Sequence, residues 1–593
     1  MAPRRDLRDN GRTGAVRRLT RRSPRRDPGR RILAILVMFA ISGVMLTRQL
    51  VQLQVVQAKA LVEQGSEQRL RSVELPARRG RIFDRDGKQL VVSVGAKTVY
   101  ADPGMVEQPR ATAEALAGVL HLPAAQIESK LRANTRFVYL ARRVDRATAD
   151  AVQALGRQGI GTIDEPKRVY SDGELGSQLL GFVGADGKGM AGVEQQYDAE
   201  LRGTPGLMVA ERDPAGRAIP QGMRSYRAPE PGQDVMLTID RYLQFVTERE
   251  LAQGVKDSNA KGGMAFVLDP RNGEILALAN NPSFDPNNYA AASSRTWRNR
   301  AVTDVFEPGS ANKVITAAAA LEEGVTNPDE VFVVPDRMSM CNQVFHDAHE
   351  HATQRLTFSE IISESSNVGT IQVAGRLGKE RMDSYLRRFG YGKRTGVGLP
   401  GESAGLIPLP KNYWCTSMGS VPIGQGIAVT ALQIGQVYAT LANGGVRIAP
   451  HLLKAVVDER GNVHAAAEPA AERVISAATA ARLSVILQKA VDDGTGTSAS
   501  VPGLSVAGKT GTARKPLEGQ RGYSDAYVAS FVGFLPVEAP RLVVGVILDE
   551  PVPIFGGVVS APVFSRIASI AAARLGIAPA SPAPSGSPLR RLP

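Results

Sequence analysis

The chain has 593 residues, of which 43% are hydrophobic and 22% are charged, and this composition excludes a largely disordered or fibrous protein. A chain of this length predicts two or more domains. The formal net charge is +14, but residues 1–31 alone contribute +9, through 12 Arg and 3 Asp. The basic charge is therefore concentrated in a tail, which argues against a nucleic-acid-binding face and favours a solvated, disordered cytoplasmic segment.

An uncharged, apolar run of 16 residues, 32–47, follows the tail. As a helix it would span roughly 24 Å, and the arginines on both sides could extend it to the thickness of a bilayer. Because most of these arginines precede the run, we predict a transmembrane helix over residues 32–48, with a cytoplasmic N-terminus and the rest of the chain outside the cell membrane. A cleaved signal peptide and a buried helix of a soluble protein are the competing interpretations. The small residues at 58–60 lie too far from the run for the usual cleavage.

Residues 49–230 are predicted to form a mixed α/β module that carries no catalytic constellation. Apolar residues recur at helical spacing over residues 49–68, which predicts a helix that leaves the membrane and is terminated by Pro76. The turn sequence Asp86-Gly87 lies between two apolar stretches, as in a β-hairpin. The high density of glycine in residues 170–230 indicates turns and bends rather than long helices.

A Pro- and Gly-rich stretch at residues 228–232 marks the clearest domain boundary. We expect a second domain over residues 231–577 and a disordered tail, rich in Ala, Pro and Ser, over residues 578–593. Within the second domain the apolar patterns predict a helix at 241–256 and strands at 235–239, 263–268, 274–279, 527–534 and 541–548.

The second domain contains three short motifs in a fixed order: Ser310-Ala-Asn-Lys313, Ser365-Ser-Asn367 and Lys509-Thr-Gly-Thr512. Each motif alone often occurs by chance, but the three together, in this order, do not. A serine hydroxyl is a weak nucleophile until a neighbouring base takes its proton, and a lysine one helical turn later can reach that hydroxyl. A lysine held near other cations or away from water loses its proton more easily. The set therefore indicates an enzyme with a nucleophilic serine.

The surroundings of Ser310 support this role. Pro308-Gly309 forces a turn, and the residues after it are strong helix formers as far as Gly324. Ser310 is thus expected at a helix N-terminus, where outward-pointing N–H groups favour a developing negative charge. Ser258-Asn-Ala-Lys261 fits the same S-x-x-K pattern, but it lacks the turn and precedes a strand, so we reject it as a catalytic motif.

With these motifs the chain resembles the class B penicillin-binding proteins, and more narrowly their FtsI-type division transpeptidases. The resemblance runs over nearly the whole chain, and the arginine-rich, lysine-poor composition is typical of a GC-rich, actinobacterial genome. The resemblance implies an α+β multidomain fold. One transmembrane helix is followed by a mixed α/β pedestal of the dimerisation type and by a transpeptidase domain, whose central antiparallel sheet is flanked by helices as in serine β-lactamases. Further blocks that carry the resemblance lie at 79–87, 192–203, 422–433, 443–445, 494–496 and 555–562.

The resemblance implies a serine-type D-Ala–D-Ala transpeptidase. Ser310 would be the nucleophile that attacks the donor stem peptide, and Lys313 would be its general base. Ser365 would relay a proton to the leaving D-alanine. Asn367 would hold the peptide amide, and Lys509 would set the electrostatics around Ser365.

The resemblance also assigns the rest of the site. Thr510, Gly511 and Thr512 would bind the substrate, with the two threonines at the terminal carboxylate. The backbone N–H groups of Ser310 and Thr512 would form the oxyanion hole. An amine of a neighbouring strand would take the acyl group, whereas a β-lactam would mimic the donor and remain attached. No cofactor and no metal are implied.

The two cysteines, Cys341 and Cys415, could pair outside the cell, with free buried thiols as the alternative. Cys341 also begins a cluster of residues of metal-binding types. Their spacing matches no usual zinc site, so a polar surface loop near the active-site cleft is favoured over a metal site. The other members of the cluster are His346, Asp347, His349, Glu350 and His351.

Several functions remain open on the sequence. A D,D-carboxypeptidase or β-lactamase would pass the acyl group to water, and an elongation-type transpeptidase would act outside division. A non-catalytic β-lactam-binding scaffold or sensor belongs to another class. By resemblance, the partners would be peptidoglycan stem peptides, β-lactams, the membrane, an FtsW-type glycosyltransferase and other division proteins, with residues 49–230 as the partner-binding pedestal and no nucleic acid.

Overall fold

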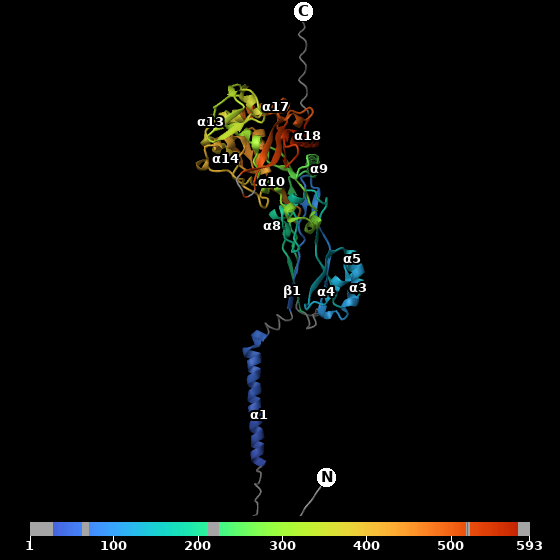
Figure 1. Ribbon diagram of the computed structural model, residues 1–593. Helices are drawn as coiled ribbons and strands as arrows, with labels where there is room; N and C mark the ends of the chain where they lie inside the picture. The colour runs from blue at the N-terminus through green and yellow to red at the C-terminus, as the bar shows by residue number, and fades with distance from the viewer. Residues whose placement is uncertain (1–27, 62–69, 212–223, 518, 520–521, 579–593) are drawn as a thin grey trace, which may run out of the picture. The chain divides into compact units, whose positions relative to one another are not determined.

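The computed structural model describes residues 28–61, 70–211, 224–517, 519 and 522–578. The chain divides into two compact units (Figure 1). One is formed by the N-terminal helix with residues 207–227, and the other by residues 75–206 and 228 onwards.

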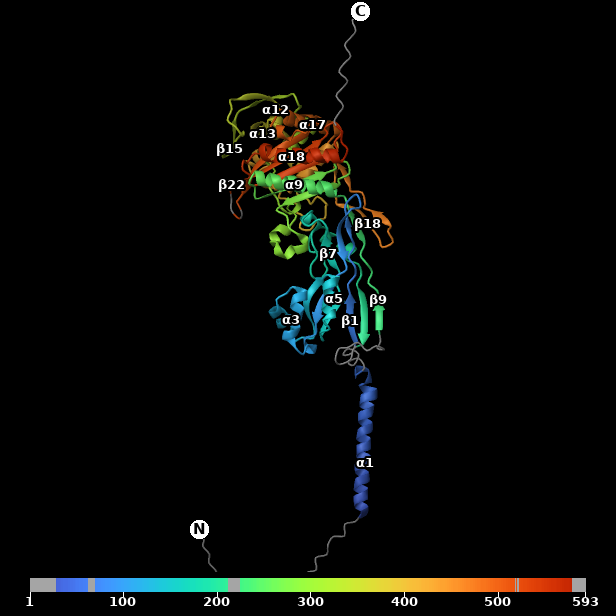
Figure 2. The ribbon, with the colours of Figure 1, turned by 90° about the vertical axis from the view of Figure 1, so that its right-hand side faces the viewer.

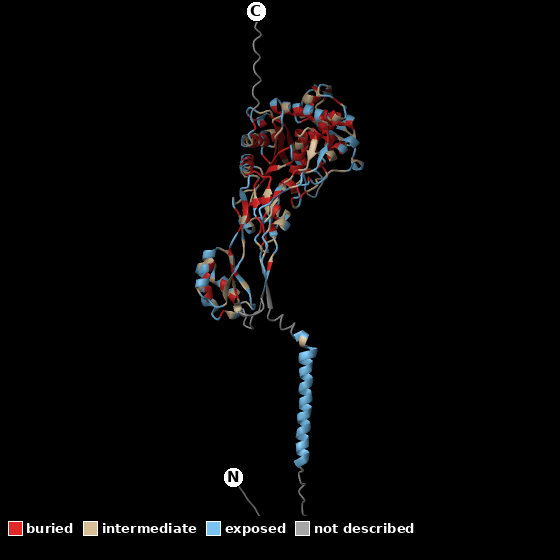
Figure 3. Ribbon diagram, turned by 180° about the vertical axis from the view of Figure 1, so that it is seen from behind, coloured by how far each residue is buried: buried red, intermediate tan, exposed pale blue. Residues whose placement is uncertain are grey.

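The N-terminal unit begins with α1 (Pro28–Val51), which contains the predicted apolar run and continues as a π-helical turn, η1 (Gln52–Val56). The helix has no buried residue and is exposed over its whole length (Figure 3). It is long and apolar enough to cross a membrane. α18 (Gly556–Arg574) passes the same test, but half of its apolar window is buried, as in a core helix.

The helix predicted after the membrane run is only partly present. Immediately before Pro76 the chain forms a strand, β1 (Leu70–Leu75), so the expectation that a helix ends at this proline is wrong. β1 is hydrogen-bonded to β8 (Gly206–Glu211), which pairs in turn with β9 (Arg224–Arg227). A partner strand far along the chain thus decides the conformation, and local periodicity does not reveal it. Residues 62–69 lie outside the described residues.

A small α/β lobe follows in the second unit. Its three-stranded sheet, in the order β5-β4-β6, packs one face on three helices around Val99, Leu116, Ile127 and Leu140. The elements are β4 (Lys97–Ala101), η2 (Pro103–Met105), α3 (Pro109–Leu120), α4 (Ala124–Leu131), β5 (Val138–Val144), α5 (Arg146–Ala154) and β6 (Ile160–Asp164).

A six-stranded sheet, in the order β19-β18-β10-β2-β3-β7, joins strands from before and after the stretch 228–232. The predicted hairpin at Asp86-Gly87 is present between β2 and β3, and the helices in the described parts of the glycine-rich region, residues 170–211 and 224–230, are short, as predicted. The elements are β2 (Ile82–Phe83), β3 (Gln89–Val94), β7 (Lys167–Tyr170), α6 (Ser177–Leu180), α7 (Gly192–Gln196), α8 (Asp198–Arg202), β10 (Asp234–Leu237), β18 (Leu453–Val457) and β19 (Val463–Ala465).

The core of the second domain is a five-stranded antiparallel sheet, in the order β12-β11-β23-β22-β21. Both faces are covered, which explains why β11 is apolar throughout: Phe266 packs toward α11 and α16, and Val267 toward α9 and α18. Figure 2 shows α9 and α18 side by side. This sheet confirms the predicted fold class and four of the predicted strands, while the strand predicted at 235–239 is β10 of the six-stranded sheet. The bounds are α9 (Arg241–Asp257), β11 (Gly262–Leu268), β12 (Ile275–Asn281), α11 (Lys313–Glu322), α16 (Ala431–Ala442), β21 (Ala507–Pro516), β22 (Tyr523–Leu535) and β23 (Leu542–Asp549).

Further helices and small hairpins complete the domain. They are η3 (Pro286–Ala291), η4 (Ser294–Trp297), α10 (Arg300–Thr303), η5 (Gly309–Asn312), β13 (Val331–Val334), β14 (Arg337–Met340), β15 (Gln343–His346), β16 (Gln354–Thr357), α12 (Phe358–Ser363), α13 (Asn367–Leu377), α14 (Lys379–Arg388), η6 (Pro410–Asn412), α15 (Ser417–Ser420), η7 (Val421–Ile423), β17 (Val446–Ile448), β20 (Ala471–Arg473), α17 (Ala477–Asp492) and η8 (Thr497–Ala499).

Candidate active site

The first motif lies at the start of α11, as the sequence predicts. Ser310 is in the 3₁₀ turn η5 and is half-buried, while Lys313 begins the α-helix and is fully buried. Gly309, immediately before the serine, has φ 53°, a left-handed conformation that favours glycine. The turn therefore presents the hydroxyl at the surface and sends the amine one turn later into the interior.

Lys313 links the first motif to the second. Its Nζ donates to the carbonyl oxygen of Ser365 at 2.5 Å and to Oδ1 of Asn367 at 2.8 Å, and lies 3.3 Å from the hydroxyl of Ser365. In the part of the chain that the structure describes, this amine contacts neutral oxygens and forms no ion pair. Burial lowers the pKa of Lys313 well below the ordinary lysine value, the positive charge of Lys509 lowers it further, and Asp347 partly opposes both effects.

The second motif connects α12 to α13. Ser365 has φ 68°, an unusual value for a residue with a side chain. Ser366 is the N-cap of α13 and accepts a hydrogen bond from the backbone N–H of Gly369 at 2.9 Å. The cap fixes the direction in which α13 starts, and with it the position of Asn367.

The sequence analysis missed the role of Asp347 in the active site. This buried carboxylate accepts hydrogen bonds from the hydroxyl of Ser366 and from the backbone N–H groups of Asn367 and Val368. Nε2 of the His351 ring lies 3.1 Å from Oδ2 of Asp347, the oxygen that also accepts from Ser366. Two donors of the second motif and one from the residue after it thus converge on Asp347, which the sequence alone suggests only as a weak metal-ligand candidate. The contact joins segments about 20 residues apart, so no local pattern signals it.

The third motif lies within the edge strand β21. Lys509 is 1% exposed, and burial lowers its pKa to about 7. Its amine lies 3.5 Å from the hydroxyl of Thr495 and 3.4 Å from that of Thr510. Thr512 is half-buried, and its hydroxyl accepts from the N–H of Gly556 at 3.3 Å.

Glycines bring the first and third motifs into contact. A Cβ on Gly309 would lie 2.9 Å from the carbonyl oxygen of Thr512, and a Cβ on Gly511 would lie 2.9 Å from that of Pro308. A side chain at either position would separate the turn of Ser310 from β21. The structure therefore gathers all the predicted catalytic and binding residues in one place.

Glu307, which the sequence analysis did not single out, anchors the turn before Ser310. Its carboxylate accepts from the N–H of Gly426 at 2.9 Å and from the hydroxyl of Tyr523 at 3.0 Å. Burial raises the pKa of Glu307 above its usual range. The turn is thus tied both to the loop before α16 and to β22.

The rejected motif and the two cysteines have structural roles. Ser258 is the C-cap of α9, and its hydroxyl donates a hydrogen bond to the carbonyl oxygen of Gly254. Cys341 and Cys415 form a disulfide with Cα atoms 6.3 Å apart. Among the described residues, no three His, Cys, Asp or Glu side chains are grouped to hold a metal ion.

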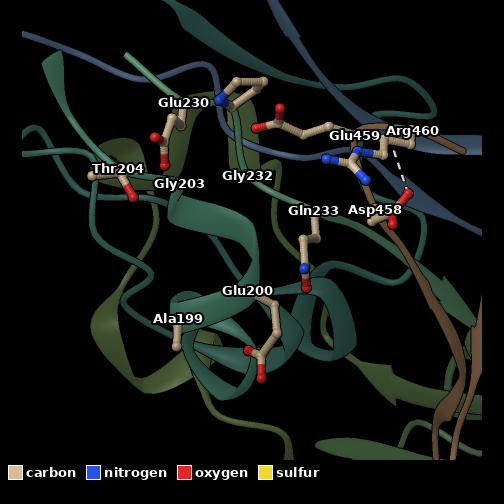
Figure 4. A pocket seen from close by; sticks show the side chains of 11 residues that line it. Ala199, Glu200, Gly203, Thr204, Glu230, Gly232, Gln233, Asp458, Glu459 and Arg460 are labelled. Atoms are coloured by element: carbon tan, nitrogen blue, oxygen red, sulfur yellow. Dashed lines mark hydrogen bonds between the residues drawn. The ribbon is translucent and has the colours of Figure 1, made fainter. Parts of the chain in front are cut away.

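A pocket of about 550 Å³ lies away from the three motifs (Figure 4). The ends of α8 and β10 and the turn between β18 and β19 line it. Glu200, Glu230 and Glu459 are among its residues, and the N–H of Arg460 donates to Asp458 at 2.9 Å. None of the residues that line it belongs to the catalytic motifs.

Comparison with known proteins agrees with this geometry. Residues 263–569 match the penicillin-binding protein transpeptidase domain, and residues 74–237 match the penicillin-binding protein dimerisation domain. The penicillin-binding protein PbpB of Mycolicibacterium smegmatis is 37% identical, over 94% of this chain and 91% of its own. The peptidoglycan D,D-transpeptidase FtsI of Escherichia coli is 34% identical, over 87% of each chain. The crystal structure of penicillin-binding protein 3 of Mycobacterium tuberculosis with aztreonam has a TM-score of 0.68 at 32% identity, over 86% of this chain and 99% of that one.

Proposed function

This chain belongs to the class B penicillin-binding proteins, and we propose that its peptidoglycan D,D-transpeptidation proceeds through an acyl-enzyme on Ser310 during septal wall synthesis. The observation that carries this proposal is the state of Lys313. Its amine is fully buried, holds the second motif through neutral oxygens, and begins the helix one turn after the serine. A neutral amine in that position can take the proton of the serine hydroxyl.

Acylation follows from these positions. Lys313 removes the proton from Ser310 as its oxygen attacks the carbonyl carbon between the two D-alanines of a stem peptide. The bond to the terminal D-alanine breaks, and the leaving nitrogen receives a proton through Ser365, which lies within reach of Lys313. The product is an ester between the serine and the shortened peptide.

The third motif supports binding and charge stabilisation. Thr510 and Thr512 bind the terminal carboxylate of the donor, beside the amine of Lys509. The backbone N–H groups of Ser310 and Thr512 donate to the oxyanion, a contribution of about 3 kcal/mol per donor in other acyl transferases. Gly511 keeps β21 close to the turn of the serine.

The acceptor amine of a neighbouring strand then attacks the ester, which forms the cross-link and releases the serine. A β-lactam mimics the donor, but its leaving group stays attached and the acyl-enzyme persists.

The membrane arrangement is part of the proposal. The N-terminal apolar helix anchors the protein in the cell membrane, with the basic residues 1–31 on the cytoplasmic side. The catalytic domain then faces the wall, where stem peptides are found. The partners are an FtsW-type glycosyltransferase and other division proteins, and a fluorescent fusion of the chain is expected at the septum rather than along the side wall.

Intact-mass measurement of the full chain in detergent, after incubation with a penicillin, tests the acyl-enzyme. We expect an adduct of one penicillin on the wild type and none on Ser310→Ala. An adduct that persists in the Ser310→Ala variant would reject Ser310 as the nucleophile. Rapid hydrolysis of the penicillin without an adduct would instead identify a β-lactamase.

A further inference from the structure

The first and second motifs are each supported by a separate segment, and the disulfide joins these two segments. We call the β14–β15 hairpin, residues 337–346, the bracing hairpin, and residues 415–424 the supporting loop. Cys341 is in the turn of the bracing hairpin, and Cys415 begins the supporting loop. The two cysteines are 74 residues apart in sequence.

The supporting loop holds the first motif. The side-chain amide of Asn312, within the motif, donates to the carbonyl oxygen of Val421 at 3.0 Å. The hydroxyl of Thr316, one turn further along α11, donates to the carbonyl oxygen of Pro422 at 2.8 Å. The N–H of Gly309 donates to the carbonyl oxygen of Gly424 at 3.1 Å. The loop therefore fixes the turn before Ser310 and the start of α11.

The bracing hairpin holds the second motif. Its last residue, His346, accepts a hydrogen bond on its carbonyl oxygen from the side-chain amide of Asn367 at 2.9 Å. The next residue, Asp347, accepts from Ser366 and from the backbone of Asn367, and its own N–H donates to the carbonyl oxygen of Asp336 at 2.9 Å. The second motif is thus attached to the base of the bracing hairpin.

A small apolar cluster also joins the two segments. Phe345 of the bracing hairpin is 4% exposed and forms a cluster with Ile371 of α13 and Ile423 of the supporting loop. A Cβ on Gly419 would lie 2.3 Å from its ring, so the ring packs directly on the backbone of α15. Among the described residues the cluster has three buried side chains, with the partly buried Met338 and Met340 packed against it, and is much smaller than the cores on both faces of the central sheet.

We propose that the Cys341–Cys415 disulfide and the Phe345–Gly419 contact form a brace that positions Ser365 and Asn367 relative to Ser310 and Lys313 during acyl transfer. The cysteines touch no reacting atom and act through the two segments. The proposal rests on the acyl-serine function proposed above. Loss of the brace lets the second motif move away from the amine of Lys313.

Displacement of the second motif also changes the surroundings of Lys313, an effect that is not expected if the disulfide only stabilises the fold. Lys313 is buried partly by its contacts with Ser365 and Asn367, and the charged groups that act on it are Lys509 on β21 and Asp347 after β15. Water that enters this contact raises the pKa of Lys313 toward its ordinary value. Acylation needs the neutral amine. As the pH is lowered, the acylation constant therefore begins to fall at a higher pH than in the intact protein.

The test compares the wild type with a Cys341→Ser/Cys415→Ser variant, as full chains in detergent. The second-order constant for acylation by a fluorescent penicillin is measured across acid and neutral pH. We expect the constant to fall by about 10-fold to 100-fold, the range for a misplaced positioning group, and the acidic limb of the profile to move to higher pH. Ile567→Ala, a large-to-small change at a buried position of α18 with an expected cost in stability similar to that of losing a disulfide, serves as the control and should leave the limb in place.

Reduction of the folded wild type gives an independent test in case the variant fails to fold. A phosphine reductant converts the disulfide to two thiols and is itself oxidised to the phosphine oxide, with oxygen from water. The reduced protein should gain the mass of two hydrogens, acylate as slowly as the double variant, and recover on reoxidation. Gly419→Ala, which keeps both cysteines but displaces the Phe345 ring, should change the acylation constant in the same direction.

Equal acylation constants and equal acidic limbs for the oxidised, reduced and double-serine proteins would overturn the proposal. A lower unfolding temperature with an unchanged limb would also overturn it, because the disulfide would then only stabilise the fold. A wild type that penicillin does not acylate at all would instead reject the acyl-serine function itself.

Discussion

In the pedestal, the fully buried carboxylate of Glu194 lies between two arginines, with Nε of Arg79 at 2.6 Å and Nε of Arg168 at 2.7 Å. In the active site, Lys313 and Lys509 are buried just as deeply, but their amines contact carbonyl, amide and hydroxyl oxygens instead of carboxylates. The two regions bury charge-bearing side chains to the same extent and give them opposite surroundings.

The difference shows how burial serves structure in one region and chemistry in the other. Burial lowers the pKa of Arg79, but Glu194 and Asp198 outweigh it and leave the pKa raised, so the guanidinium stays charged. Burial lowers the pKa of Lys509, and burial together with the positive charge of Lys509 lowers the pKa of Lys313, where Asp347 offsets the effect only in part. A paired buried charge holds segments together, whereas an unpaired buried lysine becomes a base.

Removing the amine of Lys313 should have the largest effect. We expect Lys313→Met to lower the acylation constant by about 10² to 10⁴, the usual contribution of a general base, without loss of stability because methionine fits an apolar interior. Stopped-flow acylation by a fluorescent penicillin checks this. Lys256→Met, on the exposed face of α9, should acylate normally. A Lys313→Met protein that keeps more than a tenth of the rate would contradict the assignment.

The opposite result is expected in the pedestal. Glu194→Gln leaves two buried guanidiniums without their counter-charge and should lower the free energy of unfolding by about 3–5 kcal/mol. Acylation by the molecules that remain folded should not change. Denaturant unfolding and the acylation assay measure the two quantities, with the exposed Glu107→Gln as the control. Slower acylation at full stability would remove the contrast between the two regions.

Asp347 is the one carboxylate that acts on Lys313, and its replacement should have an intermediate effect. Asp347→Asn places an amide donor against N–H and O–H donors of the second motif, so we expect about a tenfold slower acylation, equivalent to ~1.4 kcal/mol. His351→Gln keeps a donor toward Asp347 and should change the rate less. Equal rates for the wild type and Asp347→Asn would mean that the second motif does not depend on this anchor.

A further prediction concerns stability and pH. Lys509 has a pKa of about 7 in the folded protein and 10.5 ordinarily, so between these values the unfolded chain binds a proton that the folded chain does not. The free energy of unfolding therefore gains from this residue as pH rises, by at most about 1.4 kcal/mol per pH unit. Thermal unfolding of wild type and Lys509→Met should differ most near neutral pH and converge at alkaline pH. A constant difference would exclude a lowered pKa.

The sequence predicts the site well where spacing is local and poorly where the chain returns from a distance. Ser310 and Lys313 lie one helical turn apart, so their proximity follows from helix geometry. Asp347 reaches the second motif through a hairpin, and no periodicity encodes that contact. The pairing of Cys341 with Cys415 was only one of two possibilities for the same reason.

The fold shows the same limit. Strands such as β11 and β12 are predicted because an unbroken apolar run and a turn signal are local features. β1, by contrast, is not predicted, since the local pattern indicates a helix that ends at Pro76. Its hydrogen-bonding partner, β8, lies more than 100 residues away, and no local feature reveals the pairing. The sheet that joins β2 with β10 and β18 across residues 228–232 is likewise a product of long-range pairing.

The pH dependence of acylation tests the central claim, an unpaired buried lysine as the base, most directly. The second-order constant for acylation of the full wild-type chain by a fluorescent penicillin is measured from acid to alkaline pH. We predict a limb that rises with pH and reaches its plateau well below 10.5, the ordinary lysine value. A constant that keeps rising through the range of an ordinary lysine would show that Lys313 is charged at neutral pH and would contradict the account.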